Sequence, residues 1–287
     1  FLSIEDFPNP EYVRSYVSDA SSFDKLIELY EAHEASGDGS PMFIFNVTMQ
    51  NHGSYSKTYA NFEPDVFYSP DPGKYPEAEQ YLSVAHKTDA AVEDLIEYFS
   101  NCDEPTVICF FGDHLPSLKD GFYEMLMGVN NTADLAPDQM QKLYMTDYFI
   151  WANYDIPEAE LEAMSLNYLS TMLFQVADIP LTQYQLFLTK MYSDYPVLTA
   201  MGVGDKENTY IGSASALNQD FWNYYQVLQY NNVFGKEMRD NSLFDKPYYV
   251  VRSENNTNEI VANVGNPAVI TPVPNKPTIT PTPAVSD

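Results

Sequence analysis

The sequence predicts an α/β fold, in which a sheet of parallel strands carries helices on both of its faces. Segments with helical spacing alternate with short apolar runs typical of buried strands, the pattern of such a fold. The 287 residues suffice for a sizeable core, and 23 Tyr and 17 Phe supply apolar surface to bury. We therefore expect an ordered domain rather than a disordered chain.

The first helix and the first strand are expected before residue 51. "SSFDKLIELYEAHEA", residues 21–35, has apolar residues at helical spacing and a serine cap at Ser21 or Ser22. "SGDGSP" then breaks the chain. "MFIFNVTMQ", residues 42–50, follows as a bulky, β-branched and aromatic run, which predicts a strand covered on both faces.

The same alternation continues to about residue 250. A long helix is expected over residues 77–101 and a second buried strand over residues 106–111. Helix, strand, helix and strand in succession predict the parallel arrangement. Further elements are expected as a strand over residues 148–152, helices within residues 166–180 and 216–235, and a late strand in "KPYYVVRS".

The domain is expected to span residues 1–250. Residues 251–287 contain the end of the late strand and then a Pro/Thr-rich segment, "GNPAVITPVPNKPTITPTPAVSD". This segment has no hydrophobic periodicity, so we expect an extended or disordered tail.

Charge and cysteine content exclude some classes of function. Lys and Arg number 14 against 41 Asp and Glu, a formal charge of −27 that repels nucleic acid and anionic lipid surfaces. Cys102 and Cys109 form neither a disulfide framework nor a Cys-x-x-Cys pair, so they do not identify a compartment. No apolar run reaches the length of a transmembrane helix. We expect no nucleic-acid partner.

Polar motifs follow two of the expected strands. "NHG" places His52 after the first strand, and "GDH" places Asp113 and His114 after the second. Ligands bind at this edge of α/β sheets. A carboxylate and an imidazole suit Zn²⁺, Mn²⁺ or a related divalent ion. Since neighbouring strand residues point to opposite faces, both reach one ion only where the chain has left strand geometry, which Gly112 allows.

Each motif also has a purely structural interpretation. Asp113 is typical of a cap for the next segment, His114 of a surface histidine, and Asn-His-Gly of an ordinary turn. His33 and His86 lie in expected helices, where histidines are more often packed or solvated than ligating. The spacing alone leaves these alternatives open.

Several blocks in fixed order resemble one family. They are "NVTMQNHGSY", "YLSVAHKTDAAVEDLIEYF", "FFGDHLPSL", "DYFIWANYD" and "YYQVLQYNNVFGK". Over residues 1–250 the chain resembles the carboxyl-terminal part of the catalytic domain in the lipoteichoic acid synthase and phosphoglycerol transferase family. These enzymes are sulfatase-like members of the alkaline phosphatase superfamily. Ordered blocks are more specific than any single motif.

The resemblance implies a sulfatase/alkaline-phosphatase-like sheet with helices on both faces, in an extracellular domain tethered to the cell membrane by an amino-terminal segment. It implies transfer of glycerol phosphate from a phosphatidylglycerol-type lipid, through a phosphorylated threonine, to a glycolipid, teichoic acid or glucan acceptor. The implied cofactor is one divalent ion, Mn²⁺, with Mg²⁺ and Zn²⁺ as alternatives. By the family's motifs, Asp113 and His114 are metal ligands and His52 contacts the substrate phosphate.

Other expected residues have no counterpart here. The family's nucleophilic threonine, its first acidic metal ligand and the His, Trp and Arg residues that hold glycerol phosphate are expected upstream of Phe1, in a missing amino-terminal part. No catalytic nucleophile is identifiable, so we expect the chain alone to be inactive. The alternatives are another superfamily enzyme, such as a sulfatase or phosphoethanolamine transferase, and a non-catalytic remnant that binds a surface polymer or a protein.

Overall fold

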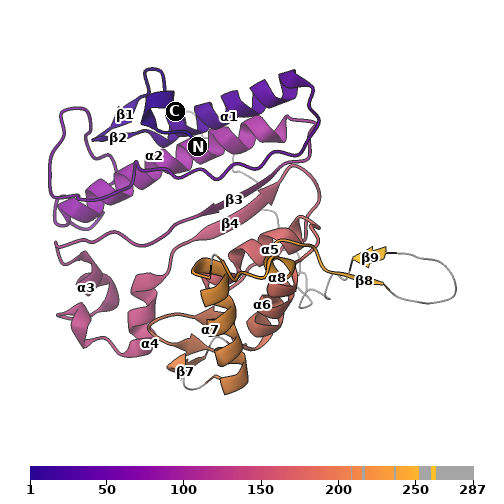
Figure 1. Cartoon of the computed structure of the whole chain (residues 1–287). Coiled ribbons are helices and arrows are strands. Elements are labelled where there is room, and N and C mark those ends of the chain that lie inside the picture. The colour runs from indigo at the N-terminus through magenta and orange to yellow at the C-terminus, as the bar shows by residue number, and fades with distance from the viewer. Residues whose placement is uncertain (208, 215–216, 236, 252–259, 263–287) are drawn as a thin grey trace, which may run out of the picture. The chain divides into compact units, whose positions relative to one another are not determined.

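The structure is a computed structural model that describes residues 1–207, 209–214, 217–235, 237–251 and 260–262 (Figure 1). It divides into two compact units. The first contains residues 1–106, 111–136 and 143–148, and the second contains residues 107–110, 137–142 and 149–287.

The first unit consists mainly of two long helices and a small hairpin. Its main elements are β1 (Tyr12–Val13), β2 (Tyr16–Val17), α1 (Asp19–Ser36), α2 (Pro76–Ser100) and α3 (Phe122–Met127). Both predicted helices are confirmed, although Ser18 rather than Ser21 or Ser22 caps α1 by accepting the amide of Ser21. Helices α1 and α2 pack side by side (Figure 1), and Tyr30 meets Phe99 edge-on at 5.2 Å between ring centroids.

The core of the first unit joins the hairpin to α2. Buried side chains of Val13, Tyr55, Phe62 and Val84 form one cluster. The hairpin strands pair antiparallel and are only two residues long each, so they depend on this packing for stability.

The predicted strand at residues 42–50 is wrong. The structure assigns no strand there, and Phe43, Phe45 and Val47 are 82%, 68% and 65% exposed. Bulky and β-branched residues favour an extended backbone, but a strand also requires a neighbour to complete its hydrogen bonds. In the described part of the chain this segment has no ladder partner.

The strands predicted at residues 106–111 and 148–152 are confirmed as β3 (Val107–Phe111) and β4 (Tyr148–Ala152). The expected parallel arrangement does not hold for this pair. The amide of Gly112, just after β3, donates to the carbonyl of Asp147, just before β4, so the paired strands run antiparallel. Both strands are half-buried, and Phe110 stacks on Phe149 at 5.5 Å.

The second unit is mostly helical. It contains α4 (Pro137–Met140), α5 (Leu169–Val176), α6 (Gln183–Asp194), α7 (Gln219–Val233) and α8 (Asn241–Phe244), with short antiparallel strands β5 (Val197–Leu198), β6 (Val203–Gly204), β7 (Tyr210–Gly212), β8 (Tyr249–Val251) and β9 (Ile260–Ala262). Helices α5 and α7 and strand β8 were predicted. Helix α6 was missed, although Thr182 and Gln185 form a capping box at its start.

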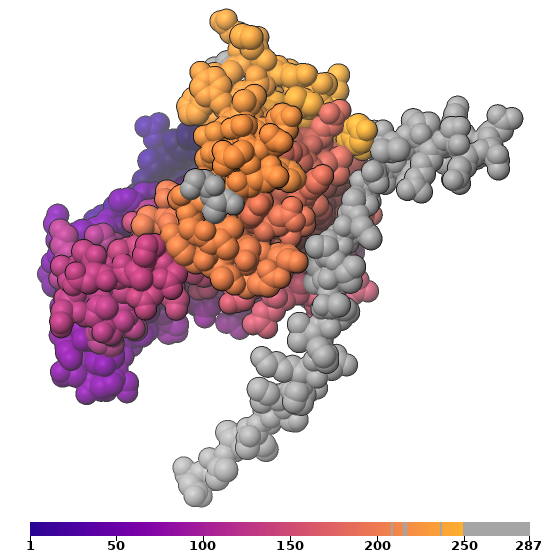
Figure 2. Space-filling model, turned by 90° about the horizontal axis from the view of Figure 1, so that it is seen from below, coloured from indigo at the N-terminus to yellow at the C-terminus, as the bar shows by residue number. Residues whose placement is uncertain are grey.

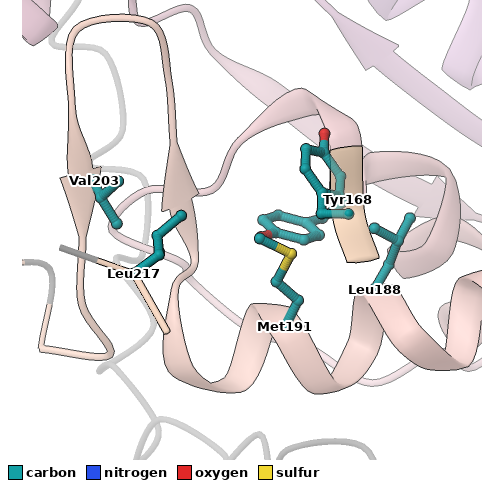
Figure 3. Close-up of a cluster of buried hydrophobic side chains, with 6 residues drawn as sticks. Tyr168, Leu188, Met191, Val203 and Leu217 are labelled. Atoms are coloured by element: carbon teal, nitrogen blue, oxygen red, sulfur yellow. The ribbon is translucent and has the colours of Figure 1, made fainter. Parts of the chain in front are cut away.

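The core of the second unit is a cluster around α6. Figure 3 shows Met191 facing Tyr168, with Leu188 one turn earlier and Val203 beside Leu217. Methionine is unbranched and fills irregular gaps between such rings. Burial of these side chains is the main stabilising contribution in this unit.

Helix α7 has an exposed apolar and aromatic face. It lies within the orange surface of Figure 2 and exposes Tyr224, Val227 and Tyr230.

The structure describes only part of the expected carboxyl-terminal tail. Of the expected tail, residues 252–259 and 263–287 lie outside the described residues, while β9 pairs with β8. Among the described residues, no helix combines the length and apolar character needed to span a membrane.

Candidate functional site

The loop that carries His52 is anchored through the residues before it. The buried Gln50 donates from Nε2 to the Val84 carbonyl at 3.2 Å and to Thr88 Oγ1 at 3.0 Å. Its Oε1 accepts the backbone amide of Asp19 at 3.2 Å. Asn51 also donates to Thr88 Oγ1, at 2.8 Å. These contacts connect the start of the loop to both α1 and α2.

A buried carboxylate completes this anchor. Thr88 donates from Oγ1 to Asp19 Oδ2 at 2.6 Å, and Asp19 is fully buried. Burial raises the pKa of Asp19, while the hydrogen bond from Thr88 lowers it, and the net shift is upward. The loop therefore rests on a buried polar network that α1 and α2 share.

Every backbone carbonyl of residues 50–54 accepts a hydrogen bond from a side chain. Arg14 donates from Nη2 to the carbonyls of Gln50 and His52 and from Nη1 to that of Ser54, Tyr55 donates to Asn51, and Tyr16 donates to Gly53. Backbone carbonyls in an exposed turn usually bond to water. This loop is therefore held in one shape by three side chains of the first unit.

His52 presents one ring nitrogen to solvent. Its Nδ1 lies 3.0 Å from the Gly53 carbonyl oxygen and 3.0 Å from Tyr16 Oη, and the two rings meet edge-on at 5.6 Å between centroids. A carbonyl oxygen only accepts, so Nδ1 carries a proton. In the described part of the chain Nε2 of this exposed ring has no hydrogen-bond partner, which leaves it free for a ligand.

Asp113 and His114 lie just beyond β3 and are brought together. Nε2 of His114 is 3.6 Å from Asp113 Oδ2, and the side chains are 83% and 70% exposed for Asp113 and His114 respectively. His114 Nδ1 lies 2.9 Å from the Leu115 carbonyl, so Nδ1 carries a proton, and Nε2 is the ring nitrogen that a metal ion could reach. Both residues follow the end of β3 at Phe111, so the condition that the chain has left strand geometry is met.

The pair fits part of a metal site. Ligand atoms bound at ~2.1 Å to one tetrahedral ion lie roughly 3.4 Å apart, close to the separation of this oxygen and nitrogen. Two ligands are fewer than a protein site usually supplies. Among the residues that the structure describes, no three His, Cys, Asp or Glu side chains converge as a metal-binding group. Asp113 and His114 could therefore supply at most half of the ligands of a four-coordinate metal site.

Gly112 is favoured by close packing, and not by the change of backbone direction for which it was predicted. A Cβ at this position would lie 3.0 Å from the Cβ of Thr146. Thr146 Oγ1 also donates to the Gly112 carbonyl at 2.7 Å. The glycine thus admits a close approach of the segment before β4, which fixes where the "GDH" turn begins.

The other histidines and the two cysteines lie apart from the Asp113–His114 pair in the sequence. In the described residues, no hydrogen bond or ion pair joins His52 to Asp113 or His114. His33 Nε2 lies 2.7 Å from the Ser40 carbonyl, and His86 Nδ1 lies 3.7 Å from Asp65 Oδ1. Cys102 Sγ donates to the Tyr98 carbonyl at 3.5 Å, and in the described residues neither Cys102 nor Cys109 belongs to a disulfide.

Sequence reasoning missed Arg14 and Tyr16. Both belong to a hairpin whose strands are too short to show periodicity. One signal was available: Arg14 is a rare cation in an acidic chain, and it stands between apolar and aromatic residues in "YVRSYV". Such a setting favours a buried guanidinium over a solvated one.

A family model and two curated proteins match the sequence of this chain. A family model described as sulfatase matches residues 1–179. A Rhizobium meliloti (strain 1021) protein whose name assigns it provisionally to cyclic beta-1,2-glucan modification is 27% identical over 258 residues, 85% of this chain and 38% of that protein. The capsular polysaccharide biosynthesis protein RkpI of the same strain is 29% identical over 145 residues, 49% of this chain and 21% of that protein.

A solved structure shows the same fold. The Streptococcus pyogenes phosphoglycerol transferase GacH, in complex with sn-glycerol-1-phosphate, matches with a TM-score of 0.56 and 20% identity, over 83% of this chain and 55% of that one. The predicted α/β fold of the sulfatase type is therefore confirmed. The chain spans little more than half of GacH and less of the two Rhizobium proteins.

Proposed function

The chain belongs to the sulfatase family, and from that premise we propose that the full-length protein transfers glycerol phosphate from a phosphatidylglycerol-type lipid to a cell-envelope acceptor. The observation that carries this proposal is the His52 loop. It presents an exposed imidazole nitrogen from a backbone whose carbonyls are all held. Rigid presentation of one donor suits recognition of an anion with fixed geometry.

His52 would contact a phosphoryl oxygen through Nε2. Since Nδ1 already holds a proton beside the Gly53 carbonyl, donation from Nε2 uses the doubly protonated, cationic ring. The positive charge matches the negative charge of the phosphoryl group. GacH was solved in complex with sn-glycerol-1-phosphate, which supports glycerol phosphate as the group to test first.

Asp113 and His114 would hold one divalent ion, Mn²⁺ in the first instance, with Mg²⁺ and Zn²⁺ as alternatives. Such an ion supplies Lewis-acid stabilisation of charge on phosphoryl oxygens and activates a hydroxyl nucleophile. The exposed Nε2 of His114 and the nearby Asp113 carboxylate support this assignment. Further ligands would come from other parts of the full-length protein.

The transfer itself balances as two displacements. A threonine oxygen from another part of the full-length protein forms a bond to phosphorus as the bond to the diacylglycerol oxygen breaks, and diacylglycerol leaves with a proton. An acceptor hydroxyl oxygen then forms a bond to phosphorus as the bond to the threonine oxygen breaks, and the acceptor's proton restores the threonine hydroxyl. The names of the two Rhizobium proteins support a saccharide acceptor such as a glucan, with a glycolipid or teichoic acid as alternatives. An extracellular domain tethered to the cell membrane would meet such substrates.

Release of diacylglycerol tests this function. The full-length protein with Mn²⁺ and phosphatidylglycerol vesicles should release diacylglycerol, measured by mass spectrometry. His52→Ala should retain the metal and lower the rate by about 100-fold, because a charge-matched donor is lost. His33→Ala, which removes a histidine in the last turn of α1 whose Nε2 contacts the Ser40 carbonyl, is the matched control.

The alternative is sulfate ester hydrolysis, which the description of the matching family model favours. Sulfate and phosphate esters present similar tetrahedral anions, so the same metal-loaded protein should also be assayed with an aryl sulfate. Sulfate release without diacylglycerol would replace the proposed reaction. Neither product from the metal-loaded protein would favour a non-catalytic remnant that binds a surface polymer or a protein.

A further inference from the structure

Arg14 is buried without a carboxylate partner. Its side chain is 4% exposed, and no ion pair compensates its charge in the described part of the chain. Burial of an unpaired charge is unfavourable unless other groups solvate it. Here carbonyl oxygens do so, together with Gln80 Oε1 at 3.3 Å from Nη1 and the ring of Tyr55, whose centroid lies 4.7 Å from the guanidinium carbon.

The backbone of Arg14 is also unusual. It occupies the two-residue turn between β1 and β2 with φ +57°, a conformation that favours Gly, Asn or Asp. Asn61 holds this backbone by donating from Nδ2 to the Arg14 carbonyl at 3.1 Å. A strained arginine at a turn indicates a role for its side chain, and that side chain reaches the His52 loop.

The contacts of Arg14 are concentrated on that loop. Nη2 donates to the Gln50 carbonyl at 2.7 Å and to the His52 carbonyl at 2.8 Å, and Nη1 approaches the Ser54 carbonyl at 3.4 Å. A planar guanidinium fixes several acceptors at once, whereas a lysine ammonium on a flexible stem does not. The fork therefore sets the position of the His52 main chain.

Tyr16, two residues further along the hairpin, fixes the ring. Its hydroxyl donates to the Gly53 carbonyl at 3.2 Å, and its oxygen lies 3.0 Å from His52 Nδ1. If Tyr16 donated to Nδ1 instead, Nδ1 would face the Gly53 carbonyl as a second acceptor. Only protonation at Nδ1 leaves no two acceptors in contact, so the Gly53 carbonyl selects the tautomer, and Tyr16 holds that carbonyl beside the ring.

We propose that Arg14 and Tyr16 are positioning residues for His52: Arg14 fixes its main chain, Tyr16 fixes its ring, and together they aim Nε2 at an anionic phosphoryl group. This proposal rests on the proposed function only for the identity of the ligand. The hairpin thus supports the binding site in addition to packing against the core of the first unit.

The test combines ligand affinity with the state of the histidine ring. Binding of sn-glycerol-1-phosphate to the full-length, metal-loaded protein should weaken by about tenfold in Arg14→Lys. A lysine ammonium cannot hold several carbonyls of the loop at once, as the guanidinium does. In a His52→Ala background the same substitution should change affinity by less than twofold, since Arg14 acts through His52. Arg239→Lys, which alters an arginine paired with Asp245, is the matched control.

Side-chain ¹⁵N NMR of labelled histidines reads the ring without ligand. His52 should show a proton on Nδ1 in the wild type and a mixture of tautomers in Tyr16→Phe and Arg14→Lys. Unchanged ring signals and unchanged affinity in both variants would overturn the proposal, as would a wild-type proton on Nε2 alone. If Arg14→Lys does not fold, Tyr16→Phe decides, with Tyr12→Phe as control.

Failure of the proposed function looks different. A wild type that does not bind sn-glycerol-1-phosphate removes the proposed ligand, while the NMR measurement still decides whether the hairpin positions His52. Equal losses of affinity for Arg14→Lys in the wild-type and His52→Ala backgrounds would show that Arg14 does not act through the histidine, and would contradict the proposal.

Discussion

The His52 loop and the Asp113–His114 turn carry motifs of similar appearance, but the protein supports them very differently. The loop has all five carbonyls held by buried or half-buried side chains. The turn is mostly exposed, and its two side chains contact each other, their own backbone and the Leu115 carbonyl. One motif is organised by contacts from distant parts of this chain, whereas the side chains of the other have only local contacts in the described residues.

This difference explains what each motif can do alone. A preorganised loop spends little ordering entropy when a ligand arrives. In the proposed metal site, an exposed carboxylate and imidazole would have to be ordered by the ion, and the ion would need more ligands than these two. We therefore expect substitutions in the turn to act on metal binding and substitutions under the loop to act on stability.

The largest expected effect is loss of metal from the turn. Asp113→Ala or His114→Ala in the full-length protein should lower Mn²⁺ affinity by at least about 100-fold, because direct ligands matter more than their supports. Metal content after dialysis, measured by mass spectrometry, checks this. Stability of the metal-free protein should change by less than about 0.5 kcal/mol, as for other exposed side chains.

The chain offers a close control for this experiment. His86 and Asp65 form another exposed pair, with Nδ1 and Oδ1 3.7 Å apart. His86→Ala should leave metal content unchanged. Equal metal loss from both histidine variants, or full occupancy in Asp113→Ala, would remove the assignment of the site to the "GDH" turn.

A smaller effect is expected beneath the loop, on stability rather than metal. Gln50→Met keeps the shape of the side chain but removes its bonds to the Asp19 amide, the Val84 carbonyl and Thr88. Leaving buried polar groups without partners should lower the free energy of unfolding by about 2 kcal/mol, measured by urea denaturation.

The exposed Gln183 of α6 provides the matched substitution, for which less than about 0.5 kcal/mol is expected. If Gln50→Met were as mild as Gln183→Met, the loop would not depend on its buried support. The contrast between the loop and the turn would then be one of exposure alone.

The sequence was sufficient for features that repeat along the chain. Periodicity predicted α1, α2, β3 and β4 within a few residues. It could not predict that β3 and β4 run antiparallel, because residues 112–147 between them are long enough to return the chain in either direction. It also could not show that residues 42–50 lack a strand partner, since propensity describes the backbone and not its neighbour.

The candidate site divides in the same way. His52, Asp113 and His114 were recognisable because each follows an apolar run in a known motif. Arg14 was not, because its contacts join residues 36 to 66 positions apart, and such pairs leave no local pattern. Supports of a site are set by tertiary packing, so they become visible only in the structure.

The smallest expected effect is a dependence of stability on pH that arises under the loop. Burial raises the pKa of the Asp19 carboxyl above its ordinary value of 3.8. The folded protein therefore holds this proton more tightly than the unfolded chain does. The resulting stabilisation is present at low pH and is lost as the pH rises from about 3.8 through the folded pKa.

Asp19→Asn removes this titration. The free energy of unfolding of the wild type minus that of Asp19→Asn should fall as the pH rises through that window, by about 1.4 kcal/mol for each pH unit that separates the folded and unfolded pKa values. The same substitution at exposed Asp24 controls for the loss of one carboxylate from α1. A difference that grew with pH would mean that Thr88 and the helix start favour the charged carboxylate, and the loop would then rest on a stabilised anion rather than on a buried acid.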